Sequence, residues 1–386
     1  MTAALQGVRV LELCEVFQGP VAAQTLADHG ADVIKIEKPG RGDSLRHSDT
    51  VANAAGKMGS YFAALNRNKR SICLDLKAEA DREVFLRLVA EADVLMHNYR
   101  PGVLEKLGFS YEALEALNPR LVYAAASGFG ESGPLSALAG QDFLIQSISG
   151  MAWKTTASRG GPTFINVPIA DYTSGMLLAQ GILLALMERT HSGRGQKVTV
   201  SLFNALVAMQ MLEAATHLNY QYETRWFDRA LNFTAEASDG WLTVIGFFRD
   251  NPLQLVCKAL GMEDLSARPQ WAGKLDQARD REALAALLAP AIRALSVQEC
   301  VDRLQGQGVL AAPILRFEQT LALPQVEANG LLAEVPVAGQ EAMRVIANPV
   351  KLHRTPMQVR SGPPHLDADR QSVLDDALGH NTRSPE

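Results

Sequence analysis

Short apolar runs alternate with helical patterns through the first third of the chain. Runs rich in Val, Ile and Leu predict β-strands at residues 8–13, 32–37, 71–76, 93–97 and 121–126. Apolar side chains recur at helical spacing between strands, as in residues 20–29 and 78–90. Strands separated by helices are typical of βαβ units, whose right-handed crossovers place helices on both faces of a parallel sheet. We therefore predict an α/β fold with a Rossmann-like large domain.

The pattern changes beyond residue 210. Short helical patterns and a few strands, such as residues 241–245, predict a smaller α+β domain at residues 225–323. A tail rich in Pro and Gly follows, and we expect it to wrap back over the large domain. The predicted large domain therefore comprises residues 1–210 and 324–386, and residues 211–224 form a linker.

Asp171 precedes the most apolar helical pattern, which runs from Gly175 to Met187. One interpretation is an N-cap, in which this carboxylate accepts a hydrogen bond from a main-chain N–H. The other is a nucleophile, because N–H groups and the dipole at a helix start stabilise a carboxylate and the oxyanion that it generates. The apolar run is shorter than the ~20 residues of a membrane span and contains Gln180, so we expect a buried core helix and no membrane.

Composition excludes several classes of protein. The 386 residues include 37 basic and 42 acidic side chains, a net charge of −5, which argues against nucleic acid or an anionic membrane as partner. The four cysteines form no C-x-x-C pair and the histidines show no ligand spacing, so we expect neither disulfides nor a metal site. No signal peptide pattern opens the chain, and the expected location is cytoplasmic.

Basic side chains are concentrated between residues 35 and 77. Nine occur there, against four acids, which indicates either a small polyanionic ligand near the strand ends or a solvated surface. A dinucleotide is not favoured: Glu37 ends the second strand, but the turn at residues 17–22 has a single glycine in place of G-x-G-x-x-G. The basic residues are Lys35, Lys38, Arg41, Arg46, Lys57, Arg67, Lys69, Arg70 and Lys77.

Several segments, in this order, resemble the class III CoA-transferase family, which also includes α-methylacyl-CoA racemase. They are residues 5–12 (LQGVRVLE), Gly19-Pro20, 30–37 (GADVIKIE), 65–71 (LNRNKRS), 98–102 (NYRPG), 118–123 (NPRLVY), 193–196 (GRGQ) and Asn348-Pro349. The resemblance covers nearly the whole chain. It implies two interlocked copies of the chain, acyl-CoA and a carboxylic acid as substrates, and no cofactor beyond the substrate coenzyme A.

The resemblance also implies roles for single residues. Asp171 matches the family nucleophile and Gln18 lies beside the thioester. The CoA-binding wall would comprise Lys38, Leu74, Asp75, Lys77, Asn98, Tyr99, Arg100, Lys106, Gly140, Gln141 and Asp142. The expected mechanism passes through an aspartyl-CoA thioester on Asp171, with N–H groups at the helix start holding the oxyanions.

Gln141 favours transfer over racemisation. Racemases of this superfamily have a histidine at this position, and glutamine cannot exchange a proton near neutral pH. Racemisation, and CoA transfer between two carboxylates of one substrate, remain alternatives. Phe247, Phe248 and Arg249 stand where formyl-CoA:oxalate transferases carry glycines, so we expect them to bind a larger acyl group or a second carboxylate, as in a succinyl-CoA-like donor.

Overall fold

The computed structural model describes residues 3–154 and 161–377, which form two compact units. The first unit comprises residues 1–211 and 327–386 and the second comprises residues 212–326. The segment expected as a linker, residues 211–224, contains helix α11 (Met211–Tyr220). The boundary therefore falls at the first turn of a helix, and the predicted 225–323 domain lies within the second unit.

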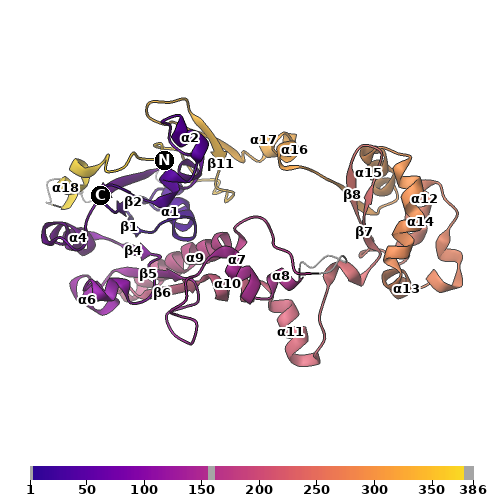
Figure 1. Cartoon of the computed structure of the whole chain (residues 1–386), viewed down its shortest axis with the longest axis horizontal. Helices are drawn as coiled ribbons and strands as arrows, with labels where there is room; N and C mark the ends of the chain where they lie inside the picture. The colour runs from indigo at the N-terminus through magenta and orange to yellow at the C-terminus, as the bar shows by residue number, and fades with distance from the viewer. Residues whose placement is uncertain (1–2, 155–160, 378–386) are drawn as a thin grey trace. The chain divides into compact units, whose positions relative to one another are not determined.

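A six-stranded sheet in the order β3-β2-β1-β4-β5-β6 forms the centre of the first unit (Figure 1). All five strand pairs are parallel, which confirms the predicted α/β class. The chain runs from β1 through β2 to β3 on one side and then crosses to β4 on the other side of β1, so a topological switch point lies between β1 and β4. The strands are β1 (Arg9–Leu13), β2 (Asp32–Glu37), β3 (Lys69–Cys73), β4 (Val94–His97), β5 (Val122–Ser127) and β6 (Lys197–Ser201).

Alternate residues of these strands fill two separate cores. Leu11, Ile34 and Leu95 pack with α4 (Glu79–Glu91) and α6 (Tyr111–Leu117) on one face. Val10, Val33 and Val94 pack with α1 (Gln18–Asp28) and α9 (Ile169–Ser192) on the other face. Successive residues of a strand point to opposite faces of the sheet, and helices cover both faces of this parallel sheet. Both sets of residues are therefore apolar, and each strand appears in the sequence as a continuous apolar run.

Shorter elements complete the first unit. The tail forms an antiparallel pair of strands and returns to the sheet, where the main-chain N–H of Asp369 donates to Ser71. The elements are α2 (Thr50–Ala54), α3 (Ser60–Asn66), α5 (Val103–Lys106), α7 (Asp142–Ile148), α8 (Met151–Lys154), α10 (Leu202–Met209), β10 (Leu332–Val335), β11 (Met343–Ile346) and α18 (Arg370–Ala377).

The second unit has its own core under an antiparallel sheet in the order β7-β8-β9. Leu242 and Val244 of β8 are fully buried, and helices α12, α14 and α15 contribute Val256, Leu288 and Leu304 to the same cluster. Its strands and α-helices beyond α11 are β7 (Asn232–Glu236), β8 (Trp241–Ile245), α12 (Pro252–Leu260), α13 (Lys274–Arg279), α14 (Arg281–Arg293), α15 (Val297–Gly306), β9 (Leu310–Ile314) and α16 (Phe317–Leu321). Helix α17 (Pro324–Ala328) spans the boundary between the two units.

Helix α9 is longer than its apolar run. It has 24 residues with a mean hydropathy of 1.4 over its most apolar window, so by length and composition alone it qualifies as a membrane span among the described residues. The helix is therefore longer than the apolar run of residues 175–187 on which the prediction of a core helix rested. However, Leu178, Ile182 and Ala185 of this helix are buried against the sheet core, and core helices of soluble proteins pass the same test.

Candidate active site

A cavity of about 620 Å³ opens at the carboxyl ends of β1, β4 and β5, where open α/β sheets bind their ligands. It lies entirely in the first unit and includes the switch point between β1 and β4. Its lining consists of Glu15, Val16, Phe17, Gln18, Lys38, Asn98, Tyr99, Arg100, Pro101, Ser127, Gly128, Leu138, Ala139, Gly140, Gln141, Asp171 and Leu202.

Asp171 lies in the first turn of α9 and not at its N-cap. The helix begins at Ile169 after Pro168, and no side chain of the capping residue accepts a hydrogen bond. The cap comes from α7, where one Asp142 oxygen accepts from the N–H of Ala170 at 2.7 Å and from that of Asp171 at 3.1 Å. The N-cap interpretation of Asp171 was therefore wrong, and its carboxylate is left for the cavity.

Asp142 was expected in the CoA-binding wall, but it does not line the cavity. Its side chain is buried, and its second oxygen accepts from Gln146 Nε2 at 2.7 Å. Gln146 in turn accepts from the N–H of Ile165 at 2.9 Å and donates to its carbonyl at 3.0 Å. Asp142 and Gln146 therefore hold both ends of the segment that carries Asp171.

The N–H groups at the start of α9 are already occupied. Those of Ala170 and Asp171 donate to Asp142, and that of Tyr172 donates to Pro168. The expectation that they hold an oxyanion is therefore wrong. At the start of α1, in contrast, the N–H groups of Phe17 and Gln18 have no acceptor in the part of the chain that the structure describes, and both residues line the cavity.

Burial, together with the neighbouring negative charge of Asp142, raises the pKa of Asp171 from 3.8 to about 7. Within the described residues no cation forms an ion pair with Asp171. A carboxylate in this state is about half ionised at pH 7 and more basic than an ordinary aspartate. Greater basicity strengthens a carboxylate as a nucleophile, and an acidic group with a strongly shifted pKa in a cavity marks a candidate active site.

Gly175 brings α1 and α9 close together beside Asp171. A Cβ atom at this position would lie 2.5 Å from the main-chain oxygen of Gln18 and 2.4 Å from a methyl group of Val21. Gly175 lies one turn after Asp171, so the absence of its side chain lets the nucleophile segment approach the start of α1. Gln18 is buried and its Nε2 donates to the carbonyl of Ser127 at 3.4 Å.

Asn98 connects the ends of β1 and β4. Its Oδ1 accepts from the N–H of Glu15 at 3.0 Å, and its Nδ2 donates to the Glu15 carbonyl at 2.7 Å. Both polar groups of this side chain are therefore engaged with the cavity wall. Asn98 lines the cavity as predicted, and its contacts support the β1–α1 turn.

A second cavity of about 450 Å³ shares Lys38 and Tyr99 with the first. Leu74, Asp75 and Lys77 line it, so the structure brings these predicted residues together. Lys38 Nζ lies 2.9 Å from Glu15 and 5.7 Å from the centre of the Tyr99 ring. The two cavities are therefore neighbours, with Asp171 lining the first and Lys77 lining the second.

The remaining wall residues are distributed unevenly. Arg100, Gly140 and Gln141 line the first cavity, and the exposed Arg100 has no ion pair among the described residues. Gly140 packs against Gly128, where an added Cβ would lie 2.3 Å from the neighbouring Cα. Lys106 is exposed at the end of α5 and lines neither cavity.

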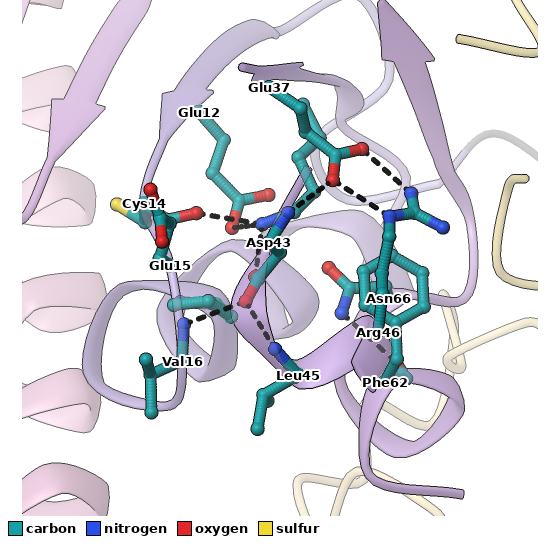
Figure 2. A network of polar contacts seen from close by, with 12 residues as sticks. Glu12, Cys14, Glu15, Val16, Glu37, Asp43, Leu45, Arg46, Phe62 and Asn66 are labelled. Atoms are coloured by element: carbon teal, nitrogen blue, oxygen red, sulfur yellow. Dashed lines mark hydrogen bonds and ion pairs between the residues drawn. The ribbon is translucent and has the colours of Figure 1, made fainter. Parts of the chain in front are cut away.

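Most of the basic cluster proves to be structural, as Figure 2 shows in part. Lys35 and Lys69 are fully buried and pair with Glu12, while Arg46 pairs with Glu37. Arg67 and Arg70 pair with Asp28 and Asp32. Of the nine, Lys38 and Lys77 line the two cavities described above, so the basic ligand-binding segment stays a prediction for these two.

Phe247, Phe248 and Arg249 belong to the second unit, and none of them lines either cavity. The two rings contact each other edge to face with centroids 5.1 Å apart. Phe248 is 69% exposed, and Arg249 Nε donates to the carbonyl of Gly308 at 2.5 Å. Their role in substrate binding stays a prediction.

The cavity also contains residues that sequence reasoning did not single out. Glu15, Val16 and Phe17 follow β1, Ser127 is the last residue of β5, and Gly128 follows it. Their positions at strand ends were the available signal. Among the described residues no group of three or more His, Cys, Asp or Glu side chains is placed to hold a metal ion.

A half-buried carboxylate with a raised pKa, in a cavity at the switch point of a parallel α/β sheet, is typical of an enzyme active site. A model of CoA-transferase family III matches residues 5–370, and the chain belongs to this family. The succinyl-CoA:mesaconate CoA-transferase of Haloarcula marismortui is 33% identical over 97% of this chain and 96% of its own. The acetyl-CoA:oxalate CoA-transferase of Acetobacter aceti is 34% identical over 94% of this chain and 92% of its own.

Solved structures support the same family assignment. A CAIB/BAIF family protein from Brucella suis superposes with a TM-score of 0.88 at 30% identity, covering 98% of this chain and 100% of that one. The predicted enzyme class, a CoA-transferase of family III, is thereby confirmed.

Proposed function

We propose that this enzyme moves CoA from an acyl-CoA donor to a carboxylic acid through an aspartyl-CoA thioester on Asp171. The observation that carries the proposal is the placement of Asp171 in the cavity. Its main-chain N–H is bound to Asp142, its carboxylate has no ion-pair partner among the described residues, and its pKa is raised to about 7. Such a group combines a free reactive atom with unusual basicity.

The reaction then proceeds by exchange of carboxylate and thiolate. Asp171 attacks the thioester carbonyl of the donor, which forms a mixed anhydride and releases the CoA thiolate. The thiolate attacks the aspartyl carbonyl, which gives the aspartyl-CoA thioester and frees the donor acid. The acceptor carboxylate attacks this thioester, which forms a second mixed anhydride and releases the CoA thiolate again. The thiolate then attacks the acceptor carbonyl of this anhydride, which gives the new acyl-CoA and frees the Asp171 carboxylate.

Each attack places negative charge on a carbonyl oxygen, which needs hydrogen-bond donors. Because the first turn of α9 is occupied, we assign this role to the free N–H groups of Phe17 and Gln18 at the start of α1. The positive end of the α1 dipole favours the same charge. The Gln18 side chain, whose Nε2 donates to the Ser127 carbonyl, orients the thioester carbonyl of the substrate.

The two joined cavities suit a long ligand with one reactive end. We place the CoA thiol arm in the first cavity beside Asp171 and its nucleotide end in the second, around Leu74 and Lys77. Lys38 lines both cavities and Arg100 lines the first, and we assign to both the binding of phosphate by charge-assisted hydrogen bonds. This arrangement retains the predicted wall, except for Lys106 and Asp142.

A dicarboxylate is the acceptor that we propose. The relatives in Acetobacter aceti and Haloarcula marismortui are named for oxalate and mesaconate, and a third, in Agrobacterium fabrum, for succinate and glutarate. The donor that we propose is succinyl-CoA-like. We also propose that the working enzyme is an interlocked homodimer in the cytoplasm.

The test is a transfer assay with a matrix of acyl-CoA donors and mono- or dicarboxylic acids, analysed by mass spectrometry of the acyl-CoA products. New acyl-CoA that forms with the wild type and not with Asp171→Ala supports the proposal. The same reactions in D₂O report exchange of the α-proton. Proton exchange without any acyl-CoA product would contradict transfer and favour the racemase alternative.

A further inference from the structure

We propose that Asp43 is a positioning residue for CoA transfer: with Lys35 it holds the β1–α1 turn in a strained conformation that places Phe17 and Gln18 in the cavity. This inference rests on the proposed function. It concerns a carboxylate that lies outside the cavity and that contacts the reacting groups only through the main chain.

The turn is strained at Val16, whose φ angle is 69°. A β-branched side chain rarely adopts this left-handed conformation, because its Cβ substituents crowd the main chain. Such strain costs on the order of 1–3 kcal/mol and persists only where the surroundings enforce it. Val16 itself lines the cavity and is 47% exposed, so burial of its side chain does not explain the strain.

Four successive main-chain groups of this turn are held by side chains. Lys35 Nζ donates to the carbonyl of Cys14 at 2.8 Å, and Asn98 binds the N–H and carbonyl of Glu15. The N–H of Val16 donates to Asp43 Oδ1 at 3.1 Å. The path of the chain into α1 is therefore set by side chains of β2, of the loop after β2 and of the loop after β4. Figure 2 shows the contact between Asp43 and Val16.

A buried charge cluster fixes the position of Asp43. Its Oδ2 lies 2.9 Å from Lys35 Nζ, which lies 3.3 Å from Glu12; Glu12 also pairs with Lys69 at 2.8 Å. The four side chains, two acids and two lysines, are completely inaccessible to solvent. Asp43 Oδ1 also accepts from the N–H of Leu45 at 3.0 Å, and the N–H of Asp43 donates to Glu37 at 2.9 Å.

A buried pair of this kind adds little net stability compared with apolar residues of the same shape. The role of the pair is to fix geometry: Lys35 holds Asp43 Oδ2, and Asp43 Oδ1 accepts from the main-chain N–H of Val16. The next residues, Phe17 and Gln18, supply the free N–H groups of the cavity. A displacement of about 1 Å in such groups is enough to cost on the order of 10²-fold in rate.

The decisive variants are Asp43→Asn and Val16→Gly, alone and combined. Asparagine keeps the oxygen that accepts from Val16 but loses the ion pair with Lys35, so the left-handed conformation of Val16 is no longer enforced. We expect kcat for transfer to fall about 30-fold while KM for the acyl-CoA changes less than about threefold. Glycine accepts a positive φ without strain. We therefore expect Asp43→Asn to cost less than about threefold in the Val16→Gly background.

Two matched controls separate positioning from simple loss of stability. Val16→Ala keeps a Cβ atom, so it should remain sensitive to Asp43→Asn. Asp28→Asn breaks an equally buried ion pair, with Arg67, at the far end of α1. It should lower the unfolding midpoint comparably and leave kcat unchanged.

Several outcomes overturn the inference: an unchanged kcat in Asp43→Asn, equal losses in Asp43→Asn and Asp28→Asn, or fully multiplicative effects with Val16→Gly. If Asp43→Asn does not fold, the double variant Val16→Gly/Asp43→Asn decides: glycine relieves the strain, so the inference expects this variant to fold with kcat within about threefold of Val16→Gly, and a larger loss or failure to fold would overturn it. Absence of CoA transfer in the wild type would instead contradict the proposed function, which makes the two failures distinguishable.

Discussion

Replacing Asp171 by Asn should stabilise the protein while abolishing transfer. The folded state raises the pKa of this carboxyl from 3.8 to about 7, chiefly through burial and secondly through Asp142. At about 1.4 kcal/mol per pKa unit, the ionised form costs about 4 kcal/mol of folding free energy. Asparagine has nearly the same shape and no charge, so it avoids this cost.

The sign of the effect follows from proton binding. Between pH 3.8 and about 7 the folded protein holds a proton on Asp171 that the unfolded chain has released. Wild-type stability therefore falls as pH rises through this window. Above it, the full free-energy cost of the ionised Asp171 is present. The gain of Asp171→Asn should be near zero at pH 3.8, about 1.5 kcal/mol at pH 5 and about 4 kcal/mol at pH 8.5.

Urea denaturation at several pH values, followed by circular dichroism, measures this gain. Asp171→Ala is the matched control: it also removes the charge, so its stability relative to wild type should rise with pH by the same amount, offset by a constant loss of packing. A gain that is independent of pH, or a loss that grows with pH, would refute the reasoning that burial destabilises the ionised Asp171.

Three further predictions concern the site. Gly175→Ala should separate α1 from α9, lower kcat at least about tenfold and cost about 1–3 kcal/mol of stability. The control is Gly181→Ala, whose Cβ would lie 2.6 Å from Val198: it should lower stability by a similar amount and leave kcat unchanged. Asp142→Asn removes a negative charge that raises the pKa of Asp171. The pH midpoint of kcat/KM, near 7 in the wild type, should therefore shift to lower pH. An unchanged midpoint would show that the charge of Asp142 does not influence the pKa of Asp171. Arg100→Ala should raise KM for acyl-CoA about three- to tenfold, more at low salt than at high salt, with kcat unchanged.

The layered fold was predictable because its strands are buried on both faces. The strand at residues 32–37 was predicted with the observed bounds, because its apolar run begins shortly after Gly30 and ends at Glu37. Other ends moved: α1 begins at Gln18, two residues before the predicted start at Pro20. Local pattern determines the strand interior well, whereas the first turn of a helix depends on tertiary contacts.

The cap of α9 was not predictable from local sequence. The carboxylate that fulfils it, Asp142, is 28 residues away from Ala170 along the chain. Lys35 and Lys38 illustrate the same limit, because both were assigned to one basic cluster. Lys35 points from the strand into the buried charge cluster, and Lys38 lies just beyond the strand end in both cavities. Side-chain direction decides between a structural and a binding role here, and composition carries no information about it.

The most direct test of the account is mass spectrometry of the enzyme after incubation with its acyl-CoA donor and no acceptor. The account predicts a CoA adduct on the peptide that contains Asp171, its conversion to a hydroxamate by hydroxylamine, and its absence in Asp171→Asn. An active enzyme that transfers CoA without an adduct on this peptide, or with the adduct on another residue, would contradict it.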